Sequence, residues 1–247
     1  MKSPAALFCT LLLALLLADD LQAQMFSVSA GTQRQQLLLT TPSSAGTFLE
    51  FADFSLFGSI AEHANIPDYS FDGVLYGLYV RTPGLVFQLA DRTSLGPEED
   101  IRATFASLGL LAPATIRTGR TFRIGIPFGL STDYTLVRTR QTANTSAEFA
   151  QNSVYISAGL DFLFQLTQRV QLHAVSQPSI GFTVGSYGAT GGASYKLTQD
   201  VFFNVTQLAG IFGLQAGYTA AFYRFSNSDA EFRYDWSSHR LRLALTF

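Results

Sequence analysis

Three histidines are the residues of this chain best suited to proton transfer at neutral pH, and they are His63, His173 and His239. A hydrolase would need a nucleophile or a carboxylate beside one of them. The segment around His173 alternates in polarity and offers neither, so this residue is expected to fill space. His63 has Asp68 and Asp72 nearby, a composition that is common on protein surfaces. The histidines therefore do not predict an enzyme.

A larger set of charged residues occupies the polar positions of segments in which every second residue is apolar. In a narrow tube, charges of both signs would form ion pairs that close the lumen, and an excess of arginine would alternatively favour a narrow path for anions. The predicted lumen charges are Arg81, Arg92, Arg102, Arg123, Asp133, Asp161, Lys196, Asp200, Arg240 and Arg242.

The elements that would position these charges are β-strands, because a period of two is the signature of a strand with one apolar and one polar face. Residues 154–166 hold seven apolar residues in strict alternation, and the segment is longer than the ~9–11 residues that a tilted strand needs to cross a bilayer. Residues 121–138 keep one phase throughout, and Pro127 within them predicts a local break in the hydrogen-bond ladder. Such strands predict an all-β protein.

Composition narrows the class of protein. Hydrophobic residues make up 47% of the chain and charged residues only 14%, against roughly 25% charged in soluble domains. No apolar run of about 18 residues follows the N-terminus, which excludes a helical membrane protein. The formal net charge is -2 with no basic stripe, which argues against nucleic acid as a partner.

The N-terminal residues have the pattern of an export signal. Lys2 precedes an apolar core, and Leu21-Gln22-Ala23 provides a small residue at a cleavage position. We expect residues 1–23 to be a cleaved signal peptide, 24–46 a periplasmic lead-in and 47–247 the barrel. The only cysteine, Cys9, would leave with the signal, so no thiol chemistry or disulfide is expected.

Ten strands are predicted, with eight or twelve as alternatives. Residues 97–110 could start a helix at Pro97, but a strand there keeps the strand number even, with Ile101, Ala103 and Phe105 facing lipid. Residues 197–201 could instead form a turn. Loops or turns are expected at 110–120, 139–152 and 206–210. The predicted strands are 47–57, 72–81, 85–92, 101–109, 121–138, 154–166, 170–184, 193–205, 211–225 and 231–247.

The last residues carry the most specific motif. Leu241, Leu243, Leu245 and Phe247 alternate with polar residues, and the sequence ends on the aromatic ring. This ending resembles the closing strand of bacterial outer-membrane β-barrels. The resemblance implies a transmembrane antiparallel up-and-down β-barrel of the outer membrane, with Phe247 as the signal for the barrel assembly machinery. It also implies outer-membrane lipid and lipopolysaccharide as surroundings, a monomer, and no cofactor or metal.

The expected function is a structural or surface-interaction role with a charge-plugged lumen. A narrow anion-leaning pore is the alternative, and an outer-membrane hydrolase is the second alternative. The outer-membrane proteases called omptins and the lipid-A-modifying barrels use Asp/His or His/Ser sets, and none of the three histidines matches those sets. A soluble β-sandwich would explain the strands but not the continuously apolar faces.

Overall fold

The computed structural model describes residues that belong to one unit, Leu39–Phe247. The predicted signal peptide (1–23), most of the predicted lead-in (24–46) and His63 lie outside the described residues, so those expectations stay predictions. Among the described residues, no helix is long and apolar enough to cross a membrane. The described stretches are 39–57, 69–93, 101–142, 145–185, 192–226 and 233–247.

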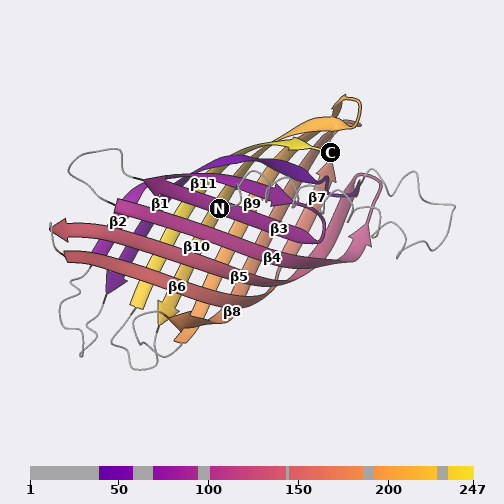
Figure 1. Cartoon of the computed structure of the whole chain (residues 1–247). Helices are drawn as coiled ribbons and strands as arrows, with labels where there is room; N and C mark the ends of the chain where they lie inside the picture. Colours follow the sequence, from indigo (N-terminus) through magenta and orange to yellow (C-terminus); the bar gives the residue numbers. More distant parts are fainter. Residues whose placement is uncertain (1–38, 58–68, 94–100, 143–144, 186–191, 227–232) are drawn as a thin grey trace, which may run out of the picture. The chain divides into compact units, whose positions relative to one another are not determined.

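The described regular structure is almost entirely β, and all strand pairs are antiparallel. The sheet order is β4-β3-β2-β1-β11-β10-β9-β8-β6-β5-β7, and the pairings β4–β5 and β8–β7 join its ends (Figure 1). Every strand therefore has a partner on both edges, which makes the sheet a closed barrel. The strands are β1 (Ser44–Phe57), β2 (Tyr69–Arg81), β3 (Leu85–Thr93), β4 (Ile101–Thr118), β5 (Phe122–Thr142), β6 (Thr145–Ala158), β7 (Leu160–Gln165), β8 (Val170–Gly185), β9 (Gly192–Ala209), β10 (Phe212–Ser226) and β11 (Arg233–Thr246).

β6 and β7 together make one span, because both lie between β5 and β8 and only Gly159 separates them. The barrel thus has ten spans, as predicted, and the all-β up-and-down fold is confirmed. The registers on either side place Pro127 of β5 opposite Gly159. Pro178 of β8 lies opposite Ala158. Since proline has no N–H to donate, the ladder is interrupted here, and the interruption divides the span in two.

The strand faces alternate as the sequence predicts over most of the barrel. On β11, Leu241, Leu243 and Leu245 project outward and are exposed, whereas Arg240 and Arg242 between them are buried in the interior. The same alternation continues through Gly159, so β6 and β7 keep a common outer face. The outer wall of the barrel is therefore apolar and its interior polar or aromatic.

The predicted facing of residues 101–109 is wrong. Ala103 and Phe105 are buried inside the barrel, whereas Leu108 and Leu110 are exposed on its outer wall. Thr104 shares the outer face and donates a hydrogen bond to Asp91 of β3. The prediction assigned apolar residues to lipid, but the interior near the start of β4 is itself aromatic, so an apolar side chain there can face either way.

Two predicted loops are strands. β4 continues to Thr118 and pairs with β5 far beyond the predicted end, with a register shift between Thr115 and Arg117. At the opposite end, β5 runs to Thr142 and β6 starts at Thr145, within the predicted loop 139–152. Polar residues stay in these strands because each has a paired neighbour to satisfy its backbone.

The other local alternatives are also decided. Residues 101–110 lie in β4, which excludes a helix over that part of 97–110. Residues 197–201 lie within β9, which excludes a turn there. The predicted turn at 206–210 is displaced to Gly210–Ile211, and Gly210 has a φ of 65° that glycine adopts without strain. We call the end with this turn and with residues 82–84, 119–121 and 166–169 the turn end, and the opposite end the far end.

Candidate functional site

Aromatic side chains fill the interior toward the far end. Phe105 of β4 meets Tyr223 of β10 with 5.9 Å between the ring centres, and it meets Trp236 of β11 at 6.2 Å. β4 and β10 are on opposite sides of the closed sheet, so these rings bridge the lumen. We call this group the aromatic layer; its members, all buried, are Phe54, Phe105, Tyr223, Phe225, Tyr234 and Trp236.

On the turn-end side of the aromatic layer, Arg240 forms an ion pair with Glu50. This is the most buried ion pair among the described residues of the interior. Nη2 of Arg240 lies 2.9 Å from Oε1 of Glu50, and the two side chains are 2% and 0% exposed. Its Nη1 donates a hydrogen bond of 2.8 Å to Gln88 of β3. The guanidinium also lies over the ring of Phe105, 4.9 Å from the centre. Arg240 thus contacts three other strands and ties the polar interior to the aromatic layer.

Glu50 was missed by the sequence reasoning. In the segment 47–57 polar and apolar residues do not alternate cleanly, so the sequence does not fix which residues face inward. The signal that could have found it is the phase of β1, in which Phe48, Ala52 and Phe54 share the buried face with Glu50.

Asp200 of β9 joins two arginines from other strands. Arg81 of β2 approaches it to 3.5 Å and Arg242 of β11 to 4.0 Å. Thr219 of β10 donates a hydrogen bond of 2.5 Å to the same carboxylate. Because β2 and β9 are not neighbours in the sheet, this group crosses the lumen.

Asp133 of β5 and Lys196 of β9 form a second link across the interior. Nζ of Lys196 lies 2.7 Å from Oδ2 of Asp133, and Ser107 of β4 donates a hydrogen bond of 2.6 Å to the other carboxylate oxygen. The ammonium group also lies over the rings of Tyr155 and Tyr223, 5.4 Å and 5.2 Å from their centres. Both oxygens of this buried carboxylate are therefore satisfied.

His173 has an acidic partner that the sequence did not reveal. Its Nε2 lies 3.2 Å from Oδ2 of Asp161, which comes from the neighbouring strand β7, and Arg123 of β5 lies 3.4 Å from the other oxygen. The absence of an acid along β8 itself was a poor guide, since the diagonal neighbour in a sheet belongs to the next strand. Because His173 is fully buried, this pair cannot reach a substrate in the described structure.

Arg123 also holds the segment that precedes β1. It donates hydrogen bonds of 3.0 Å to the carbonyl oxygen of Leu39 and to Oγ1 of Thr41. Leu39 is only 5% exposed, and Ser43 accepts a hydrogen bond from the backbone N–H of Phe247. Since β5 and β1 lie apart in the sheet, residues 39–43 cross from one wall toward the other at the turn end. We call them the strap.

The remaining predicted residues lie elsewhere. Arg92 is half-buried on β3, and Arg102 lies on β4 but its side chain is outside the described part. His239 is on the outer wall, where Oη of Tyr218 lies 2.5 Å from its Nδ1 and the ring of Phe222 packs against it. Phe247 projects from the outer wall at the turn end. Of the ten predicted lumen charges, eight therefore belong to four described ion-pair groups, which contain the carboxylates of Glu50, Asp133, Asp161 and Asp200.

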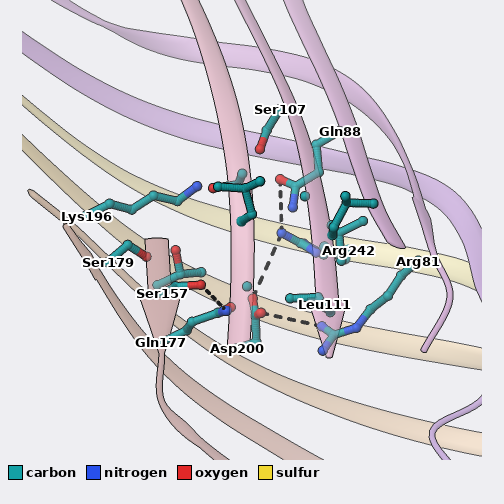
Figure 2. A pocket seen from close by; sticks show the side chains of 17 residues that line it. Arg81, Gln88, Ser107, Leu111, Ser157, Gln177, Ser179, Lys196, Asp200 and Arg242 are labelled. Carbon is teal, nitrogen blue, oxygen red and sulfur yellow. Dashed lines mark hydrogen bonds and ion pairs between the residues drawn. The ribbon is translucent and has the colours of Figure 1, made fainter. Parts of the chain in front are cut away.

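A cavity of about 60 Å³ lies among these groups (Figure 2). Figure 2 shows Arg81, Arg242 and Asp200 on one side of it and Lys196 on another. Its walls bring together side chains from β2, β9 and β11. The space suffices for a few water molecules or a small ion.

Among the comparisons with known proteins, only the one with solved structures finds similar chains. No known protein-family profile matches the chain, and no curated protein matches it. The outer membrane protease OmpT from Escherichia coli is 10% identical, with a TM-score of 0.48, and the match covers 83% of this chain and 97% of that one. The β domain of the Bordetella autotransporter BrkA is 14% identical, with a TM-score of 0.31, and the match covers 80% and 98% of the two chains.

Ail, the attachment invasion locus protein of Yersinia pestis, is 8% identical, with a TM-score of 0.25, and the match covers 84% of this chain and 100% of that one. At these identities no activity or residue role passes from those proteins to this chain. The solved structures that resemble it are bacterial outer-membrane β-barrels, and the chain is itself a closed antiparallel β-barrel of ten spans.

Proposed function

We propose that this protein is an integral outer-membrane barrel that lies in the membrane as a monomer. The support is the outer wall, where large apolar side chains such as Ile156, Ile180 and Leu243 are exposed on three different strands. Exposure of such an apolar surface to water is unfavourable, whereas the hydrocarbon chains of lipid would cover it. A bilayer also requires every strand to be paired on both edges, because lipid offers no hydrogen bonds to an unpaired edge. The closed barrel meets this requirement.

The interior is proposed to be a permanent plug, so the protein acts through its structure and its surface and does not conduct. One observation carries this proposal: side chains from strands that are not neighbours in the sheet contact each other directly across the interior, as in the Arg81–Asp200 and Lys196–Asp133 ion pairs and the Phe105–Tyr223 ring contact. A solute could pass only if several of these contacts opened together.

Conduction by small anions is the competing function. Among the described residues, the ion pairs of the polar interior bring five cations, Arg81, Arg123, Lys196, Arg240 and Arg242, against the carboxylates of Glu50, Asp133, Asp161 and Asp200. A path through this interior would therefore favour anions. In the proposed function the same charges hold the lumen shut.

Recording from single molecules in planar lipid bilayers separates the two functions. The wild-type protein should insert, as judged by its resistance to added protease, and should give no discrete current steps. Stable anion-selective steps from the wild type would overturn the plug and support the pore. Phe247 as the signal for the barrel assembly machinery belongs to the same proposal, and loss of membrane insertion in cells on Phe247→Ala would support it.

A further inference from the structure

The cavity in Figure 2 has polar walls with an excess of hydrogen-bond donors. Hydroxyl and amide side chains line it from six strands, and three cations reach it with one carboxylate, Asp200. The neutral polar residues of the lining that matter here are Ser107, Ser131, Ser157, Gln177 and Thr198.

The charges around the cavity do not balance. Lys196 has its own carboxylate, Asp133, at 2.7 Å. Arg81 and Arg242 share the single carboxylate of Asp200, at 3.5 Å and 4.0 Å. Among the described residues, one positive charge at this point of the interior is therefore left without a matching negative charge. A buried cation without a counter-charge is costly, so the surplus points to a missing anion.

Arg242 carries the surplus. It is 4% exposed, and its Nε has no acceptor among the described residues. Its other contacts are long: 3.4 Å to Gln88 and 4.0 Å to Asp200. Rings of Phe48, Tyr79 and Phe202 surround the guanidinium, and they supply no negative charge.

A second group at the cavity is also without a partner. Oγ1 of Thr198 is buried, and no described residue lies within hydrogen-bonding distance of it. Thr198 and Arg242 both line the cavity. Buried donors of this kind are nearly always satisfied in folded proteins.

We propose that this cavity is a binding site for one small monovalent inorganic anion of halide type, held by Arg81 and Arg242, the two cations that share Asp200. The volume of about 60 Å³ admits such an ion. Water could accept the same hydrogen bonds but would leave the positive charge in place. The site depends on the barrel interior and is compatible with a lumen that does not conduct.

Bromide is the probe, because it scatters anomalously and substitutes for chloride. The protein is refolded in detergent in sodium bromide and crystallised, and an anomalous difference peak is expected inside the cavity beside the guanidinium of Arg242. In solution, the thermal midpoint should rise with the logarithm of the bromide concentration and should not rise in sodium gluconate of equal ionic strength. The absence of an interior peak, or a peak on the exterior alone, would mean that the cavity holds water and would overturn the proposal.

Two variants test the assignment of the site. Ser131→Leu fills the cavity without changing any charge, and Arg242→Gln removes the surplus cation. Each should abolish the interior peak or weaken bromide binding by about tenfold or more, since one direct charged contact is worth at least that factor. Arg117→Gln removes an exposed cation near the turn end and should bind bromide as the wild type does. If Arg242→Gln does not fold, Ser131→Leu decides alone: unchanged bromide stabilisation in that variant contradicts the site.

Discussion

Glu50 and Arg240 stand directly opposite each other where the first strand of the barrel meets the last, and their side chains form an ion pair of 2.9 Å. They are 190 residues apart in the sequence. The pair therefore joins β1 to β11 at the seam that closes the barrel, and both side chains lie inside.

Removing one partner of this pair should be far more costly than replacing both. Glu50→Ala leaves the Arg240 charge buried without its carboxylate and should lower the free energy of unfolding by about 3–5 kcal/mol. The double variant Glu50→Leu/Arg240→Met should recover most of that loss. Urea unfolding in lipid vesicles measures both. Arg224→Gln is the control, because its ion pair with Asp235 is exposed and should matter by less than about 1 kcal/mol. Equal losses of unfolding free energy in Glu50→Ala, in the double variant and in Arg224→Gln would contradict this role of the Glu50–Arg240 pair.

A charge on the outer wall should be costly only where lipid covers the wall. Leu243 projects outward from β11 and is 61% exposed. Leu243→Arg should cost about 2–4 kcal/mol if the position is near the bilayer midplane. Ile211→Arg, in the turn at the end of the barrel, should cost about 0–1 kcal/mol. Urea unfolding in lipid vesicles measures both variants. If Leu243→Arg has the same free energy of unfolding as the wild type, lipid does not cover the outer wall at this position.

The strap should loosen when Arg123 is removed. Arg123→Gln shortens the side chain and withdraws the hydrogen bonds to Leu39 and Thr41. In a chain with Cys9 replaced by serine, a cysteine introduced by Leu39→Cys should react slowly with a maleimide, since this position is buried. The reaction should accelerate in Arg123→Gln and stay slow in Arg117→Gln. If all three rates are the same, Arg123 does not hold the strap.

Gly159 should tolerate no side chain. A Cβ at this position would collide with the backbone carbonyl of Ser176 in β8. Gly159→Val should therefore lower the free energy of unfolding by about 1–3 kcal/mol or prevent folding. Ala158→Val, one position earlier and exposed, should have little effect. Refolding yield in detergent, followed by gel migration with and without heating, distinguishes them; equal yields would contradict the close approach of the two strands.

The alternation of side chains could be read from the sequence because it is local. Each residue of a strand points to the face opposite its neighbour, so Arg240 and Arg242 could be placed inside and Leu241 and Leu243 outside without knowing any partner strand. The same rule placed Asp133, Asp161, Lys196 and Asp200 inside. It failed at Ala103 and Phe105, because the interior there is aromatic and polarity no longer distinguishes the faces.

The sequence by itself thus determined the class of fold and the facing of most strands, since these follow from a period of two; it favoured ten spans, and the structure decided between ten and the alternatives of eight or twelve. Only the tertiary structure decided which charges meet: Asp161 with His173, Asp200 with two arginines, Glu50 with Arg240. Those partners come from different strands, and their contacts depend on the register and on which walls face each other across the lumen. Neither quantity is encoded within one strand, so no local pattern could have revealed them.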